Sequence, residues 1–151
     1  MQDEVTVHIA APPEAVWALV SDVTRIGEFS PETFEAEWLD GATGPEVGAR
    51  FRGHVKRNGR GPTYWSPCRV TRADPHEAFE FTVGPDKLVA NTWGYRLEPA
   101  GEGTDVTEYF RLSPSPVLKL YWALAGWSRG RTNREGMQTT LERMKAALEA
   151  G

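Results

Sequence analysis

The sequence has little of what metal and cofactor chemistry requires. It contains one cysteine, Cys68, and three histidines, His8, His54 and His76, which lie far apart. One cysteine excludes an internal disulfide framework and a multi-cysteine zinc site, and the histidines have no metal-ligand spacing. A serine-nucleophile elbow, a dinucleotide fingerprint and a phosphate loop are also missing from the sequence. We therefore expect neither a bound metal nor a cofactor.

Positive charge and long apolar runs are scarce as well. Lysine and arginine total 17 against 21 acidic residues, which gives a net charge of −4, and the cationic residues form no run. This balance argues against a nucleic-acid-binding surface. The most apolar stretch, residues 117–127, is interrupted by Lys119 and is shorter than the roughly 20 residues that span a bilayer. Because the first residues also lack the basic and apolar regions of a signal peptide, we expect a soluble, cytoplasmic protein.

What the sequence has instead is a long succession of strand and turn signals. Its 151 residues match a single domain that covers residues 1–151. Apolar and polar residues alternate over residues 5–9, which predicts an opening strand. A pair of prolines and a helical spacing of apolar residues then predict a short helix to about Val20. Ser21-Asp22 predicts the cap of a second brief helix through Ile26.

From Thr33 to Leu112 the sequence contains six further strand candidates, which are separated by turn signals. They predict a meandering antiparallel sheet that has seven strands in all. A capping box, Thr132-Asn133-Arg134-Glu135, predicts a long C-terminal helix that begins near Asn133. Its apolar stripe must be buried. A strongly curved sheet wrapped around the helix would bury it, with the early helices closing one end, and would leave a pocket between helix and sheet.

Glu108 is the most unusual residue among the strand candidates. In residues 104–112 the apolar side chains of Val106, Phe110 and Leu112 share one parity, and Glu108 lies among them. Burial of an unpaired ionised carboxylate is costly, so we expect Glu108 to be paired, protonated, or next to a wet or ligand-filled cavity. It either supports the sheet through an arginine or a tyrosine, or acts on a ligand as a general acid or base.

Large aromatic side chains either fill the core or line the pocket, and the pattern leaves both alternatives open. The candidate aromatic contacts to a ligand are Phe51, Trp65, Phe81, Trp93, Tyr95 and Phe110. Alternation does not fix the direction of Trp65, because Pro67 in the same strand indicates a bulge or an edge. The other candidate ligand-binding residues are Asn91, on the same strand face as Trp93 and Tyr95, and Asn133 and Met137 of the predicted helix.

The order of these predicted elements, together with several local phrases, resembles a known superfamily. The phrases include Ala11-Pro12-Pro13-Glu14-Ala15-Val16-Trp17, Val47-Gly48-Ala49-Arg50-Phe51, Trp93-Gly94-Tyr95-Arg96-Leu97-Glu98-Pro99 and Gly103-Thr104-Asp105-Val106-Thr107-Glu108. Over essentially the whole chain they are similar to the START-like helix-grip superfamily (SRPBCC). It includes birch pollen allergen relatives and bacterial polyketide cyclase/dehydrase and lipid-transport proteins. The resemblance implies an α+β helix-grip fold, with two short helices after the first strand and an apolar-ligand pocket under the long helix, but no particular reaction.

Three functions fit these observations. The first is binding of a small hydrophobic ligand, lipid-like or polyketide-like, in the pocket. The second is a cofactor-free polyketide cyclase, aromatase or dehydratase. In such an enzyme Glu108 is the acid or base, and Tyr95, Tyr64 or Asn91 donates to an enolate oxygen. The third is a stress-type regulator that binds a protein partner through the apolar residues 117–127.

Residues 117–127 have further alternatives of their own. They form either a helix packed at the pocket mouth or a homodimer interface, or they contact a membrane surface. In the membrane alternative, Trp122 and Trp127 dip into the interface beside Arg129 and Arg131. Only these few cations support it.

Overall fold

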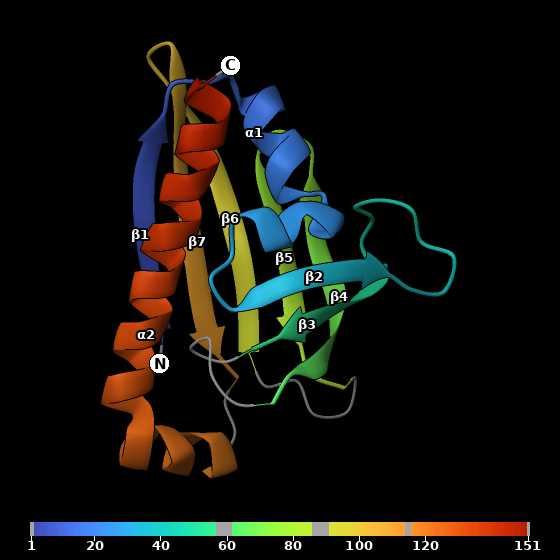
Figure 1. The fold of residues 1–151 in the computed structure, drawn as a ribbon, viewed down its shortest axis with the longest axis vertical. Coiled ribbons are helices and arrows are strands. Elements are labelled where there is room, and N and C mark those ends of the chain that lie inside the picture. Colours follow the sequence, from blue (N-terminus) through green and yellow to red (C-terminus); the bar gives the residue numbers. More distant parts are fainter. Residues whose placement is uncertain (1, 57–61, 86–90, 114–115, 151) are drawn as a thin grey trace.

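The structure is a computed structural model that describes residues 2–56, 62–85, 91–113 and 116–150, with side chains of the last segment described from residue 133 onward. Its elements follow the chain in the order that Figure 1 shows. They are β1 (Gln2–Ile9), α1 (Pro13–Val20), the 3-10 helix η1 (Val23–Glu28), β2 (Thr33–Trp38), β3 (Arg50–Val55), β4 (Tyr64–Asp74), β5 (Ala78–Val83), β6 (Asn91–Ala100), β7 (Gly103–Leu112) and α2 (Pro116–Glu149).

The described strands form one antiparallel sheet in the order β1-β7-β6-β5-β4-β3-β2. Strands β2 to β6 each pair with the next strand along the chain, and β1 is added beside β7 at the far edge. The sheet is strongly twisted, so β2 and β3 cross the direction of β1 and β7 in Figure 1. Helix α2 runs along β1 and β7. The predicted α+β helix-grip fold, with a curved seven-stranded antiparallel sheet and a long C-terminal helix, is confirmed.

Two short helices follow β1, as the sequence predicts. Helix α1 begins with Pro13, whose missing N–H is no loss because the first turn of a helix leaves its N–H groups unpaired. Asp22 caps η1, since its carboxylate accepts hydrogen bonds from the backbone N–H of Thr24 at 3.0 Å and from its hydroxyl at 2.5 Å. Helix α1 contacts β6, β7 and α2, and therefore closes one end of the space between sheet and helix.

The start of the C-terminal helix differs from the prediction. Helix α2 begins at Pro116 and not near Asn133, so the capping-box residues 132–135 lie inside the helix. A capping box is a local pattern, and it marks no helix start where the preceding residues are helical already. Pro116, by contrast, occupies the first helical position, where proline is favoured.

The apolar residues 117–127 belong to α2, but their side chains lie outside the described residues. The homodimer, membrane-contact and protein-partner alternatives therefore stay predictions. Across the part of the chain that the structure describes, no helix is both long enough and apolar enough to cross a membrane.

The core covers the concave face of the sheet, and its part nearest the C-terminal helix lies between α2 and the edge formed by β1 and β7. Met137, Leu141 and Met144 are buried, as the predicted apolar stripe of the helix requires. They belong to one hydrophobic cluster with inward-facing residues of the two strands, including Val5 and Val106. Because α2 packs against this edge, space remains between the helix and the middle strands.

Candidate functional site

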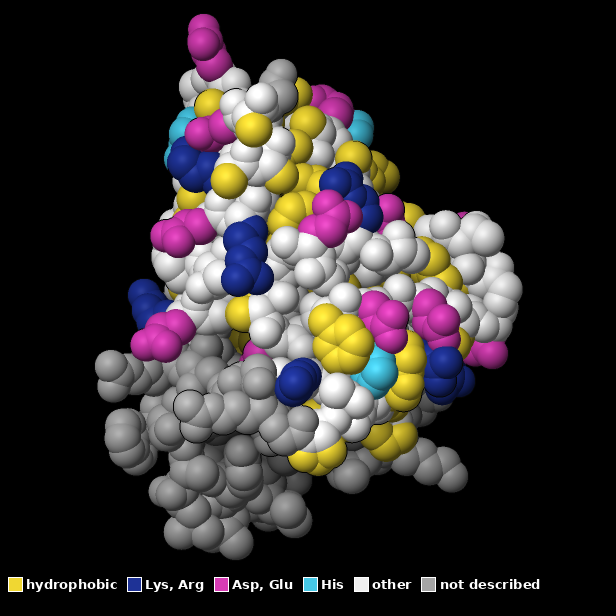
Figure 2. Space-filling view, in the orientation of Figure 1, with side chains coloured by type: hydrophobic (Ala, Val, Ile, Leu, Met, Phe, Trp, Pro, Cys, Tyr) yellow, Lys and Arg dark blue, Asp and Glu magenta, His cyan; other side chains and the backbone are white. Residues whose placement is uncertain are grey.

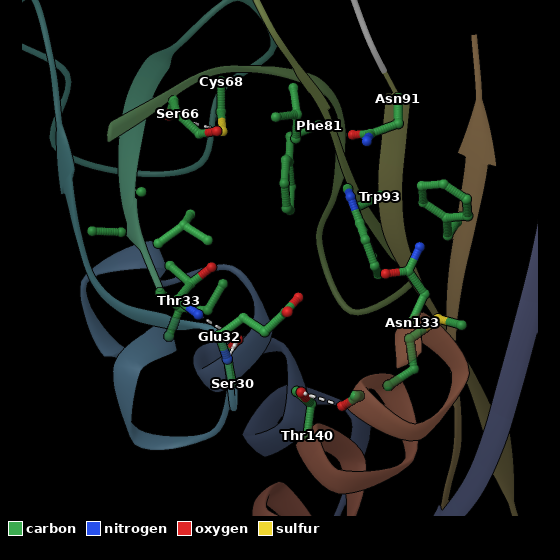
Figure 3. A pocket seen from close by; sticks show the side chains of 18 of the residues that line it. Ser30, Glu32, Thr33, Ser66, Cys68, Phe81, Asn91, Trp93, Asn133 and Thr140 are labelled. Carbon is green, nitrogen blue, oxygen red and sulfur yellow. Dashed lines mark hydrogen bonds between the residues drawn. The ribbon is translucent and has the colours of Figure 1, made fainter. Parts of the chain in front are cut away.

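A cavity of about 390 Å³ lies between the concave face of the sheet, α2 and the loop that joins η1 to β2. Figure 3 shows β6 and α2 on one side of it and β4 on the other. The volume falls within the range of about 300–1,000 Å³ that is typical of small-molecule sites. The predicted pocket between helix and sheet is therefore present.

The antiparallel register places the aromatic lining in a row across three strands. Phe81 of β5 lies opposite Trp93 of β6, and Trp93 lies opposite Phe110 of β7. The ring centroids of Trp93 and Phe110 are 4.9 Å apart, and Phe51 of β3 extends the row with its centroid 5.1 Å from that of Phe81. Since side chains alternate along a strand, residues two positions away face the same cavity. These are Val83, Asn91 and Leu112.

Tyr95 and Glu108 form the next row and lie directly opposite each other on β6 and β7. Both side chains are buried, with 4% and 6% of their surface exposed. Burial raises the pKa of Glu108 to about 8, and the hydrogen bond from Tyr95 acts in the opposite direction. Burial and the neighbouring carboxylate raise the pKa of Tyr95 well above its ordinary value. The predicted inward direction of Glu108 is confirmed, and near neutral pH its carboxyl group is mainly protonated.

Three buried side-chain oxygens at the cavity wall have no hydrogen-bond partner among the described residues. They are Asn91 Oδ1, Glu108 Oε1 and Asn133 Oδ1. A buried acceptor without a partner costs about 1–3 kcal/mol, and native proteins contain few of them. Because all three atoms belong to the same cavity, an occupant that donates hydrogen bonds would remove this cost.

Trp65 is the one candidate that does not line the cavity. Its side chain is 38% exposed, and its ring stacks on His54 with centroids 4.2 Å apart. The guanidinium of Arg52 lies 4.0 Å from the centre of the Trp65 ring. The physical reason is the register of β4, because Trp65 pairs with His54 on the outer face while Tyr64, on the other face, lines the cavity. Figure 2 shows hydrophobic, histidine and charged side chains together on the surface over β2 and β3.

The remaining candidates all lie at the cavity. They are Phe51, Phe81, Asn91, Trp93, Tyr95, Glu108, Phe110, Asn133 and Met137. Their contacts with a ligand stay a prediction.

Sequence reasoning missed the polar part of the lining that comes from outside the strands. The loop between η1 and β2 contributes Ser30 and Glu32, the first residue of β2 is Thr33, and α2 contributes Thr140. Ser30 Oγ accepts hydrogen bonds from the backbone N–H groups of Thr33 at 3.0 Å and Glu32 at 3.3 Å, which shapes the loop. Figure 3 shows the Glu32 carboxylate extending into the cavity. A serine before a proline is a turn signal, but it does not reveal which side chains of the turn reach a distant sheet.

Cys68 lines the cavity as a buried thiol. Burial raises its pKa to about 12, so the thiol stays protonated and is a poor nucleophile. In the described ranges, His, Cys, Asp and Glu side chains form no group of three or more that could hold a metal ion.

Comparison with known proteins identifies relatives of the whole chain. The model of the family "Polyketide cyclase / dehydrase and lipid transport" matches residues 3–149. A polyketide-cyclase-like protein from Corynebacterium glutamicum, solved by NMR in solution, is 30% identical and has a TM-score of 0.61. The match covers 98% of this chain and 91% of that one.

Other solved structures share the fold at lower identity. A Thermus thermophilus protein is 17% identical with a TM-score of 0.72, over 99% of this chain and 98% of that one. A Deinococcus radiodurans protein is also 17% identical, with a TM-score of 0.71 over all of both chains. No curated protein matches the chain. The match along almost the full length, the shared fold and the 30% identical relative together show that the chain belongs to the polyketide cyclase/dehydrase and lipid transport family.

Proposed function

We propose that the protein binds a small hydrophobic molecule, lipid-like or polyketide-like, in the cavity between the sheet and α2. The observation that carries this proposal is the cavity of about 390 Å³ with an aromatic row along one wall. Aromatic rings offer large apolar areas, and burial of apolar area is the main source of affinity for an oily ligand. The description of the family, which names both polyketide chemistry and lipid transport, supports the same class of ligand.

Gly136 offers a direct way to test the occupancy of the cavity. It lies on α2 at the cavity wall, and among the described residues a Cβ atom placed there has only the Pro31 side chain nearby, at 3.7 Å. A phenylalanine at this position would extend into the cavity and compete with a ligand for its volume. Gln138, two residues further along the same helix, is exposed and provides a matched control.

The experiment is native mass spectrometry of freshly purified protein, which detects a retained ligand as added mass. We expect added mass of a small apolar compound on the wild type and on Gln138→Phe, and its loss on Gly136→Phe. Circular dichroism melting of the three proteins checks that each is folded. Equal retention by Gly136→Phe and the wild type would contradict binding in this cavity.

A second function, cofactor-free cyclisation or dehydration, is favoured by the pairing of Glu108 with Tyr95. Glu108 Oε1 has no partner among the described residues, and Tyr95 supplies a phenolic donor beside it. As a carboxylate, Glu108 would take a proton from the carbon next to a ketone, and the Tyr95 hydroxyl, which then no longer faces a charged carboxylate, would donate to the enolate oxygen. The enolate carbon then bonds to a second carbonyl carbon, whose oxygen receives the proton back from Glu108. No electrons leave the substrate, so the step needs no oxidant.

This enzymatic alternative has its own test. Glu108→Gln keeps the size of the side chain but removes the base, so we expect cyclisation of a linear polyketone to slow by about 10²–10⁴-fold. Binding of the same compound, measured by calorimetry, should stay within about threefold. In the wild type the rate should rise with pH toward about 8, where the carboxylate forms. Unchanged turnover in Glu108→Gln would remove this residue as the base.

A further inference from the structure

We propose that the ligand is a largely apolar molecule that carries hydroxyl groups at several points along its length, and not a lipid whose polar group lies at one end only, such as a free fatty acid. This inference rests on the proposed ligand binding and deepens it, because it specifies where the polar groups of the occupant lie. Two features of the cavity carry it: the distribution of unpaired oxygens and the apolar side chains on the opposite wall.

The unpaired oxygens are distributed along one wall of the cavity. Asn91 and Tyr95 face the same side of β6, four residues apart, which corresponds to about 13 Å along a strand. Glu108 lies opposite Tyr95, at the far end of this distance from Asn91. Figure 3 shows Asn133 reaching the same wall from α2, beside Trp93. A ligand with one polar headgroup would satisfy one end only, so the donors must be spread along the molecule.

The opposite wall is mostly apolar. Phe51, Val55 and Cys68 of β3 and β4 face the cavity there, and Tyr64 and Ser66 of β4 add two hydroxyl groups. A fully polar ligand, such as a sugar, would leave this apolar surface and its own hydroxyl groups without suitable contacts. The occupant therefore needs an extended apolar body as well as its hydroxyl groups.

Hydroxyl groups match the unpaired oxygens chemically. A carboxylate or a phosphate only accepts hydrogen bonds, so beside these oxygens it would leave them without a donor. A hydroxyl group, in contrast, donates to an asparagine oxygen and accepts from a protonated carboxyl group.

A set of naphthalene compounds of similar size separates these classes. Calorimetry would compare 2,6-dihydroxynaphthalene, naphthalene, 2-naphthoate and 2-naphthylmethylamine on the wild-type protein near neutral pH. We expect the diol to bind about tenfold or more tightly than naphthalene, because its hydroxyl groups donate to buried acceptors that naphthalene leaves unpaired. The naphthoate, which has one polar group and no donor, should bind more weakly than the diol. The double variant Asn91→Leu/Asn133→Leu should lose the preference for the diol and bind naphthalene at least as well as the wild type does.

The outcomes distinguish this inference from the proposal on which it rests. Binding of the naphthoate or the amine as tightly as the diol would overturn the inference and leave hydrophobic binding intact. Failure of all four compounds, together with no retained ligand in native mass spectrometry, would contradict the proposed function itself.

A stability measurement adds a readout that does not depend on any ligand. Asn133→Leu should raise the melting temperature of ligand-free protein, because it removes an unpaired buried acceptor. A lower melting temperature with an unchanged preference for the diol would show a structural role for Asn133 and overturn its part in recognition.

Discussion

Glu108 links the stability of the folded protein to pH. Its pKa rises from the ordinary value of 4.5 to about 8 on folding, because burial disfavours the charged carboxylate. Between these two values the folded state holds the proton more often than the unfolded chain does. The contribution of this group to the free energy of unfolding therefore falls as pH rises from about 4.5 to about 8, and changes little outside that window.

The prediction at the residue scale compares the wild type with Glu108→Gln, which cannot titrate at this position. We expect the stability of the wild type relative to the variant to fall by on the order of 3 kcal/mol between about pH 5 and pH 8. Urea denaturation at several pH values in this range measures the difference. Two unfolding free energies that change in parallel with pH would contradict the raised pKa.

Tyr95 controls that pKa through its hydrogen bond. The bond stabilises the carboxylate form, so Tyr95→Phe should raise the pKa of Glu108 further above about 8. Carbon-13 NMR of the glutamate carboxyl groups follows the titration directly. Tyr109→Phe is a matched control, because the Tyr109 hydroxyl donates to Glu80 at 2.8 Å and lies next to Glu108 only in sequence. A Glu108 pKa that moves equally in both variants would exclude a specific effect of Tyr95.

Single residues differ in how far the sequence predicts their direction. The alternation of side chains along β7 correctly predicted that Glu108 faces inward, because the register of β7 with β1 and β6 is continuous. The same alternation gives the wrong direction for Phe34. It would place Phe34 on the same face as Ala36 and Trp38, but the Phe34 side chain is 45% exposed, because the pairing of β2 shifts between Thr33 and Glu35. Such an irregularity depends on how two strands pair, so it cannot be predicted from the residue pattern of one strand alone.

At the scale of elements, the outer face of the sheet depends on a close approach between β6 and β7. The ring of Tyr109 lies over Gly94, so that a Cβ atom at Gly94 would be 2.3 Å from the ring carbon Cζ. The Tyr109 hydroxyl group is held by Glu80, and the guanidinium groups of Arg96 and Arg111 lie within 5.1 and 5.5 Å of the ring centre. The ring therefore has little freedom to move aside.

We expect Gly94→Ala to destabilise the protein by about 1–3 kcal/mol, the usual cost of forcing extra volume into a packed site. In a Tyr109→Ala background the same substitution should cost much less, because the overlapping ring is gone. Chemical denaturation of the four proteins gives the coupling energy. Gly44→Ala is the control, since a Cβ atom there has no neighbour within 4 Å. Additive effects of the two substitutions would contradict the contact.

Helices and strands in which apolar residues repeat at a regular spacing were predicted well, and segments without such a repeat were not. Six strands after the opening one, and a short helix capped by Asp22, follow from alternation and turn residues. The start of α2 was wrong because the capping box at residues 132–135 gives no information on the helix before it. The loop that brings Ser30 and Glu32 to the cavity has no period, and its position is set by packing across the fold.

At the scale of the whole molecule, the cavity destabilises the folded state unless a ligand fills it. An empty volume of about 390 Å³ forfeits packing contacts, and three unpaired oxygens add the cost of desolvation. A ligand that binds only the folded state stabilises it by an amount that grows with the ratio of its concentration to the dissociation constant, about 2.7 kcal/mol at a hundredfold ratio. Purified protein that retains a ligand should therefore be more stable than protein from which it has been removed.

Unfolding in denaturant, removal of small molecules by dialysis and refolding would provide the stripped protein. We expect its melting temperature to lie several degrees below that of the natively purified protein, since about 1 kcal/mol shifts the melting of a domain of this size by roughly 2–4 °C. Adding back the extracted compound should restore the difference. Gly136→Phe, whose side chain takes the place of the ligand, should melt at the same temperature before and after this treatment. Equal melting temperatures for the two wild-type preparations would mean that occupation of the cavity contributes nothing to stability.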